Sequence, residues 1–313
     1  MLLCMQRSIS LFVLAGTFAL APGMVAQKIV LPLWPHGTPE PAQTTAAEAN
    51  VASAEEISQA GYPMQRIGNV TQPTLTVMPA TGPNATHAAA LVLPGGGYRR
   101  LAWDIEGLDT CRWLTSSGVT CLLVKYRVPE QGRYPENPAD LEDAQQAMRL
   151  ARQHSMEWHL DPERLGVVGF SAGGNLAVLL MTHADDTHVL STAAAKDVPL
   201  DAKGAPLDAR ANFAVLAYPA YLAVEPQQRE LEALYKPNAL TPPTFLISAE
   251  NDTQHGINAL VYARALHDAG IPVEFHYYAT GGHGFGTFPP ESKPEHDWTE
   301  LATKWLRRNG ILR

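Results

Sequence analysis

The chain has 313 residues, 46% of them hydrophobic, so it is long enough to form a sizeable core in one large α/β domain or two small ones. It carries 23 basic and 31 acidic residues, which give a formal net charge of −8. This acidic excess argues against nucleic acids and anionic membranes as partners.

The first 26 residues have the pattern of a secretory signal peptide. Arg7 precedes an apolar run over residues 9–21, and the small residue Ala26 stands before the polar Gln27. The run is shorter than the ~20 apolar residues that cross a bilayer, although an uncleaved membrane anchor stays open as an alternative. We therefore expect an exported protein, periplasmic or secreted, without membrane contact once the signal is removed.

Residues 27–66 are expected to form an irregular N-terminal arm, and residues 67–313 are expected to form one α/β domain. In the arm, Pro and Gly interrupt the chain and no apolar period persists. Trp34, in this arm, is expected to pack on the domain. Past Thr71, buried apolar strands alternate with helices, which is typical of a mainly parallel sheet with helices on both faces.

The expected elements follow one another in regular alternation. The strands are expected at residues 75–78, 87–93, 119–128, 164–170, 213–218, 244–248 and 273–278. The helices are expected at residues 104–117, 139–155, 172–183, 256–269 and 296–309. Segments 185–210 and 220–242 contain prolines and are expected to be loops near the sheet edge, so neither provides a separate lid domain.

Two cysteines would remain after signal cleavage, Cys111 in an expected helix and Cys121 at the start of the next strand. An exported protein meets an oxidising compartment, which permits a disulfide. Because spacing alone does not fix the geometry that a disulfide needs, a bonded pair and two free thiols both stay open.

The motif with the strongest chemical meaning is Gly169-Phe-Ser-Ala-Gly173. It stands between a buried strand and an apolar helix, which is the context that a nucleophile elbow requires. The turn at such an elbow is sharp, so the residues beside the serine must be small. The alternative is a tight strand–helix turn with a capping serine. We predict that Ser171 is a nucleophile at the carboxyl end of the sheet.

A glycine run, Pro94-Gly-Gly-Gly-Tyr98, follows an earlier strand. Such a run leaves backbone N–H groups free to face a developing oxyanion. Gly96 and Gly97 are the expected donors, together with the N–H of Ala172. A phosphate-binding loop would need a Lys-Ser/Thr pair that this run lacks, whereas a purely structural turn stays an alternative.

A serine hydroxyl needs a base, and the base needs a third group that holds its tautomer. The chain order in this fold class is serine, acid, histidine. His283 stands in a glycine-rich loop between the last strand and the last helix, and Asp252 follows the preceding strand. Glu250 competes with Asp252, but the chain must turn before it presents the acid. The sequence thus predicts a triad of Ser171, Asp252 and His283, which needs no metal or organic cofactor.

Other polar residues have weaker patterns. Tyr98, Asn175 and Tyr218 stand at expected strand or helix ends that face one crevice, so they are candidate substrate-binding residues, although the tyrosines could simply pack. Arg127 closes a strand and is expected to form a buried ion pair. The segment 183–188 holds two histidines without the helical i, i+4 spacing of a zinc protease, so we expect a solvated loop.

Together these motifs resemble bacterial acetyl-xylan esterase-like α/β-hydrolases, which are close to the bifunctional acetyl/feruloyl carbohydrate esterases and often carry a misleading endo-xylanase label. The resemblance covers residues 67–312 and rests on Leu93–Tyr98, Trp103-Asp104, Val124–Arg127, Asp140, Asp143–Arg149, Trp158, Asp161–Gly174, Pro242–Phe245 and Gly281–Gly286. It implies an α/β-hydrolase fold and hydrolysis of short acyl esters, with acetylated plant polysaccharide as the usual substrate.

Two departures from that family bear on the cleft rim. Residues 41–66 look longer and more irregular than usual, and Thr253-Gln254-His255 stands where an apolar residue and a proline are commoner. Three other functions remain open: a carboxylesterase for small non-sugar esters, a peptidase-related hydrolase, and a non-catalytic binding protein on a hydrolase scaffold.

Overall fold

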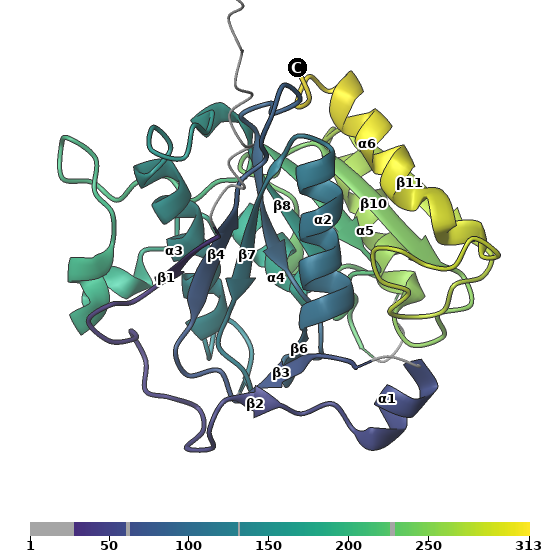
Figure 1. Ribbon diagram of the computed structural model, residues 1–313, viewed down its shortest axis with the longest axis horizontal. Helices are drawn as coiled ribbons and strands as arrows, with labels where there is room; N and C mark the ends of the chain where they lie inside the picture. The colour runs from purple at the N-terminus through teal and green to yellow at the C-terminus, as the bar shows by residue number, and fades with distance from the viewer. Residues whose placement is uncertain (1–27, 61–62, 131, 226–228) are drawn as a thin grey trace, which may run out of the picture.

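The computed structural model describes residues 28–60, 63–130, 132–225 and 229–313, so the signal peptide expected over residues 1–26 lies outside the described residues. An eight-stranded sheet with the order β1-β4-β7-β5-β8-β9-β10-β11 forms the centre of the molecule (Figure 1). β4 is antiparallel to both neighbours, and every pair from β7 to β11 is parallel. The strands are Ile29–Pro32 (β1), Thr74–Met78 (β4), Ala89–Leu93 (β5), Thr120–Lys125 (β7), Leu165–Phe170 (β8), Phe213–Ala217 (β9), Thr244–Ala249 (β10) and Val273–Tyr278 (β11).

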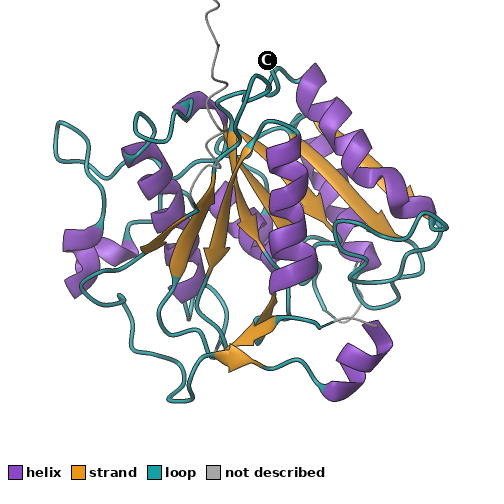
Figure 2. Cartoon of the chain, in the orientation of Figure 1, coloured by secondary structure: helices purple, strands orange, loops and turns teal. Residues whose placement is uncertain are grey.

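Helices cover both faces of this sheet, as Figure 2 shows. One buried cluster includes Trp113 of α2 and Trp298 of α6, and the other includes Met148 of α3, Leu176 of α4 and Tyr262 of α5. The α-helices of the domain are Asp109–Ser116 (α2), Ala139–Gln153 (α3), Ser171–Thr182 (α4), Gly256–Asp268 (α5) and Trp298–Arg308 (α6). This layered arrangement confirms the fold class that the alternating pattern predicts. No helix in the described ranges is both long and apolar enough to span a bilayer.

The prediction of an irregular arm over residues 27–66 is wrong in part. β1 forms the edge of the main sheet beside β4, and a second sheet joins β2 (Ala49–Asn50), β3 (Arg66–Gly68) and β6 (Arg100–Ala102). A short helix, α1 (Ala54–Ala60), lies between β2 and β3 and is seen with them in the lower part of Figure 1. These pieces are too short to show an apolar period, and β1 and β3 each pair with a strand more than 30 residues further along the chain. Trp34 is buried, as expected.

The segment expected as one helix over residues 104–117 is two elements. A π-helix spans Trp103–Leu108, and α2 begins at Asp109. The loops expected at 185–210 and 220–242 contain, in their described parts, only short 3₁₀ turns and two isolated β-bridges, so they provide no lid domain there. The 3₁₀ turns of the described chain are Pro162–Arg164, His188–Ser191, Ala193–Asp197, Ala233–Tyr235 and Pro294–Asp297.

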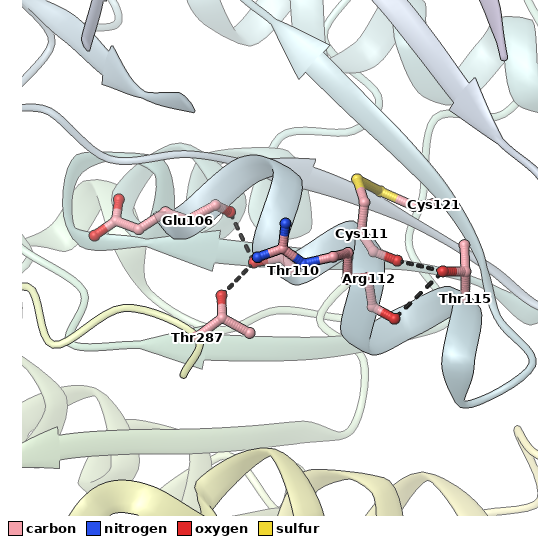
Figure 3. The surroundings of a disulfide bond; sticks show 7 residues. All are labelled: Glu106, Thr110, Cys111, Arg112, Thr115, Cys121 and Thr287. Atoms are coloured by element: carbon pink, nitrogen blue, oxygen red, sulfur yellow. Dashed lines mark hydrogen bonds between the residues drawn. A yellow bond between two sulfur atoms is a disulfide. The ribbon is translucent and has the colours of Figure 1, made fainter. Parts of the chain in front are cut away.

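The disulfide that spacing left open is present between Cys111 in α2 and Cys121 in β7 (Figure 3). The two Cα atoms lie 5.1 Å apart. The bond ties the helix to the strand that follows it, within the cluster that α2 and α6 form on one face of the sheet.

The expected buried ion pair at Arg127 is also present. Its Nε donates to Asp143 Oδ2 at 2.9 Å, and the Arg127 backbone N–H donates to the same oxygen at 2.9 Å. The indole N–H of Trp34 donates to Asp143 Oδ1 at 2.7 Å. Arg127 Nη1 also lies 3.2 Å from the carboxylate of Glu40. A single buried carboxylate on α3 therefore holds both the end of β7 and the N-terminal segment in place.

A second buried carboxyl, that of Asp140, makes stability depend on pH. Oδ1 accepts the N–H of Leu141 at 2.9 Å, whereas Oδ2 is buried without a partner among the described residues. Burial, assisted by the charge of Asp143, raises the pKa of Asp140 from 3.8 to about 7. Because the folded state then holds this proton more tightly than the unfolded state, the stabilisation is full below about pH 4 and is lost as the pH rises toward 7.

Asp140→Asn is therefore expected to be more stable than the wild type at pH 8, by about 1–3 kcal/mol, and similar to it only at about pH 3.5, where the carboxyl is protonated in both states. The asparagine keeps an acceptor for the Leu141 N–H and never has to bury a charge. Urea unfolding at the two pH values measures the difference. Glu291→Gln, which also replaces a carboxyl by an amide but at an exposed position, is the matched control. A wild-type pH dependence in Asp140→Asn would contradict the assignment.

Candidate active site

Ser171 lies at the sharp turn between β8 and α4. Its φ angle is +50°, in the left-handed region that residues with a Cβ atom rarely adopt. The turn is tight because α4 begins against the end of β5: a Cβ at Gly173 would lie 2.1 Å from the carbonyl oxygen of Leu93. Only glycine fits there, as the elbow motif requires. The Ser171 side chain thus stands at the carboxyl ends of the parallel strands, and the residue is 9% exposed.

The structure brings the three residues of the predicted triad together. Ser171 Oγ lies 2.7 Å from His283 Nε2, and His283 Nδ1 lies 2.6 Å from Asp252 Oδ2. These contacts fit an imidazole whose Nδ1–H donates a hydrogen bond to Asp252 and whose Nε2 accepts a hydrogen bond from the Ser171 hydroxyl. Glu250, which competes with Asp252 in the sequence, is exposed. Asp252 is therefore the carboxylate that contacts His283.

The environment of Asp252 favours its ionised form. Burial by itself would raise the pKa of Asp252, but the hydrogen bonds from His283 and from the backbone N–H of His255 outweigh it and hold that pKa below its ordinary value. At neutral pH the carboxylate is therefore charged. It can both fix the orientation of the imidazole and stabilise an imidazolium.

The glycine loop lies beside the elbow with two N–H groups free. Gly95 donates to Glu106 Oε2 at 2.7 Å, but within the described ranges no acceptor is found for the N–H groups of Gly96 and Gly97. Gly96 has a φ of +135°, and a Cβ there would lie 2.0 Å from the carbonyl oxygen of Arg100. The N–H of Ala172 belongs to the first turn of α4, where a helix has no internal acceptor.

A hydrogen bond from β7 also fixes the position of the glycine loop. The hydroxyl of Tyr126, at the end of β7, donates to the carbonyl oxygen of Pro94 at 2.6 Å. This contact fixes the start of the glycine run against the sheet. A preorganised set of donors needs such support, because the donors act only if they stay aimed at the developing charge.

The three expected substrate-binding residues are buried in the protein. Tyr98, Asn175 and Tyr218 are each at most 4% exposed. The Tyr98 hydroxyl donates to Asn175 Oδ1 at 2.7 Å, and the Tyr218 hydroxyl donates to Glu106 Oε1 at 2.9 Å. These hydrogen bonds use their polar atoms inside the protein, which argues against the expected contact with substrate. Tyr218 directly follows β9, whereas Asn175 lies within α4.

The rim beside His283 is formed by residues that the motifs did not single out. The ring of His255 lies 4.8 Å from that of His283 and 5.1 Å from that of Tyr221. The guanidinium of Arg133 lies 3.9 Å from the centre of the Tyr221 ring. Burial, followed by the charge of His283, lowers the pKa of His255, so this second imidazole is neutral at pH 7. The unusual Thr253-Gln254-His255 segment was the only sequence signal for this rim.

One group of side chains in the described part of the chain has the composition of a metal site: Glu40, Glu142 and His188. The segment 183–188 is largely an exposed loop, as the sequence predicts, and His188 Nδ1 lies 2.8 Å from Glu142. Arg127 lies 3.2 Å from Glu40 and 3.5 Å from Glu142. The guanidinium already provides a positive charge to both carboxylates, which disfavours a cation between them.

Comparisons with known proteins place the fold among the alpha/beta hydrolases. A family described as alpha/beta hydrolase fold matches residues 91–287. The chain is 28% identical over 226 residues to an acetylxylan esterase of Xylanibacter ruminicola, covering 65% of this chain and 42% of that protein. It is 28% identical over 215 residues to an ethyl acetate hydrolase of Pseudomonas putida, covering 63% of this chain and 65% of that protein. The chain therefore spans less than half the length of the acetylxylan esterase.

Among solved structures, an acetyl ester-xyloside bifunctional hydrolase from Caldicellulosiruptor lactoaceticus is similar at a TM-score of 0.64 and 27% identity. The match covers 93% of this chain and 100% of that chain. The resemblance to acetyl-xylan esterase-like proteins that the motifs predict is thus confirmed. Because the family match spans more than half of the sequence and the sheet has the matching layered architecture, this chain belongs to the alpha/beta hydrolase fold family.

Proposed function

We propose that this protein is a serine esterase that hydrolyses short acyl esters, above all acetyl esters, on a carbohydrate such as acetylated xylan. The observation that carries the esterase assignment is the contact of Ser171 Oγ with His283 Nε2 at 2.7 Å, beside the free N–H groups of the glycine loop. The carbohydrate part rests on the similarity to the acetylxylan esterase and to the acetyl ester-xyloside hydrolase.

The reaction has two halves. Ser171 Oγ attacks the ester carbonyl while His283 Nε2 takes its proton, and the new oxyanion accepts hydrogen bonds from Gly96, Gly97 and Ala172. The imidazolium then gives the proton to the leaving alcohol as the C–O bond breaks, which leaves an acyl-enzyme. In the second half, His283 takes a proton from water, the hydroxide attacks the acyl carbon, and the proton returns to Ser171 as the acid leaves. Asp252 stabilises the imidazolium in both halves.

A substrate panel tests the proposal at two levels. The mature protein is incubated with acetyl, butyryl and feruloyl esters, then with acetylated xylan and other acetylated glycans, and the released acid is measured. We expect hydrolysis of the small acetyl ester and acetate release from at least one glycan. Absence of acetate release from every glycan would reject the carbohydrate substrate in favour of the small-ester carboxylesterase, which the similarity to the ethyl acetate hydrolase supports.

A fluorophosphonate probe separates an enzyme from a binding protein on the same scaffold, because the probe reacts only with an activated serine. We expect stoichiometric labelling at Ser171, located by peptide mass mapping. Asp252→Asn is the matched variant: it keeps Ser171 and the shape of the site but favours the wrong imidazole tautomer, so labelling should slow strongly. An unlabelled wild-type protein would contradict the esterase assignment.

We further propose that the protein is exported. The signal-like first 26 residues and the Cys111–Cys121 disulfide support this, since disulfides persist in oxidising compartments. Expression in a bacterial host followed by fractionation tests it. A periplasmic or secreted form whose N-terminus is Gln27 is expected, whereas a full-length form in the cytoplasm would contradict export.

A further inference from the structure

Glu106 is a buried acidic residue that the triad chemistry does not use. It lies in the π-helix Trp103–Leu108 and is 3% exposed. Each carboxylate oxygen faces a different donor: Oε2 accepts the N–H of Gly95 at 2.7 Å, and Oε1 accepts the hydroxyl of Tyr218 at 2.9 Å. Two donors on two oxygens match a carboxylate used purely as an acceptor.

The contact with Gly95 places Glu106 directly behind the oxyanion donors. Gly95 immediately precedes Gly96 and Gly97, whose N–H groups are free within the described ranges. A Cβ at Gly95 would lie 2.8 Å from Ser171 Cβ and 2.8 Å from Glu106 Oε2. The glycine loop is therefore pressed between the elbow and this carboxylate, so the hydrogen bond to Glu106 sets how the loop lies against Ser171.

The contact with Tyr218 reaches the histidine loop, residues 281–287. The Tyr218 hydroxyl, which donates to Glu106, also accepts the N–H of Gly286 at 3.0 Å. The centre of the Tyr218 ring lies 5.3 Å from that of His283, which it meets edge-on. The Glu106 carboxyl thus makes two connections: one directly to the oxyanion loop, and one through Tyr218 to the loop that carries the base.

Further hydrogen bonds near Glu106 strengthen its connection to the histidine loop. The hydroxyl of Thr110 donates to the Glu106 carbonyl oxygen at 2.8 Å and lies 2.7 Å from the hydroxyl of Thr287, as Figure 3 shows. The N–H of Thr287 donates to the carbonyl oxygen of Ile105 at 3.1 Å. The π-helix and the histidine loop are therefore joined by several hydrogen bonds at this point.

We propose that Glu106 is a positioning residue that holds the oxyanion loop and the histidine loop in register around Ser171. It touches neither substrate nor the reacting atoms and acts through Gly95 and Tyr218. The inference rests on the proposed esterase function. It explains why a polar side chain is kept here, where burial raises the pKa of the Glu106 carboxyl and an apolar side chain would avoid the penalty of burying a polar group.

Glu106→Gln tests this directly. The amide is nearly the same size, but its NH₂ group must face either the Gly95 N–H or the Tyr218 hydroxyl, so one donor loses its acceptor. Since losing one oxyanion donor lowers kcat by ~10²–10³, displacing the loop is expected to lower kcat for a chromogenic acetyl ester by about 10–100-fold. KM should change by less than about threefold, because Glu106 is buried and touches no substrate.

Two further variants separate positioning from folding. Tyr218→Phe keeps the hydrogen bond between Gly95 and Glu106 and removes only the hydroxyl that joins Glu106 to Gly286. kcat should therefore fall less, by about 3–10-fold. If Glu106→Gln does not fold, this variant tests the proposal in its place.

Asp104→Asn is the control: Asp104 lies in the same π-helix but binds Arg66 and the N–H of Gln65, outside both loops. It should lower stability while kcat stays within about twofold.

The outcomes distinguish this inference from the proposed function. If the wild type reacts with a fluorophosphonate while folded Glu106→Gln keeps wild-type kcat, the esterase stands and the positioning role is wrong. Equal losses of kcat in Glu106→Gln and Asp104→Asn would also overturn it, because the effect would then be general to the π-helix. A wild type that does not react with the probe contradicts the esterase itself.

Discussion

Replacing Ser171 with alanine is expected to lower kcat/KM for a short acetyl ester by a factor of about 10⁴–10⁶. The variant loses the only atom that can attack the carbonyl, while the glycine loop and His283 stay in place. Steady-state kinetics measure the loss, and acetate release from acetylated glycans should disappear with it. Activity within tenfold of the wild type would show that Ser171 is not the nucleophile.

A control at the same position separates chemistry from backbone strain. Ser171 has a φ of +50°, and alanine keeps the Cβ and hence the strain, so the melting temperature of Ser171→Ala should match the wild type. Ser171→Gly removes a conformational cost of about 1–2 kcal/mol from the folded state, but glycine also raises the conformational entropy of the unfolded chain, which offsets part of that gain. We expect this inactive variant to be more stable than the wild type by about 0.5–1 kcal/mol. A less stable glycine variant would contradict the strained elbow.

Asp143→Ala is expected to destabilise the protein by about 3–5 kcal/mol, because it leaves the guanidinium of Arg127 buried without its closest charged partner. The side chain of Asp143 is fully buried and that of Arg127 is 3% exposed, so water cannot replace the lost carboxylate. The variant also removes the acceptor for the indole N–H of Trp34. Urea unfolding followed by circular dichroism measures the change.

Two further variants show how much of the stability lost in Asp143→Ala comes from each contact. Trp34→Phe removes only the indole N–H and a little packing, and should cost about 1 kcal/mol. The double variant Arg127→Met with Asp143→Leu removes this pair together, although it also takes the guanidinium away from Glu40 and Glu142. It should be more stable than Asp143→Ala, since the guanidinium is then no longer buried without Asp143. A double variant as unstable as Asp143→Ala would mean that packing, and not the unpaired charge, dominates the effect.

The sequence by itself determined the parts of the protein that depend on local order. Strands and helices alternate with clear apolar periods, so the layered fold could be predicted. The elbow at Ser171 needs small neighbours in a fixed pattern, and the triad residues each follow a strand in a fixed chain order. Because parallel strands present their carboxyl ends at one edge, such residues must converge whatever the detail of the loops. Arg127 could be placed in an ion pair for a similar reason: a charge that closes a buried strand needs a partner.

Only the tertiary structure decided what the polar atoms near that edge are used for. Tyr218 lies 112 residues from Glu106, and no local pattern records that its hydroxyl points to that carboxylate and not to the cleft. The same holds for β1, whose partner strand β4 lies far along the chain. A hydroxyl at the end of a strand can face solvent, substrate or the interior at equal local cost. The choice among them depends on which donors and acceptors the completed fold buries together, because each buried polar group must find a partner there.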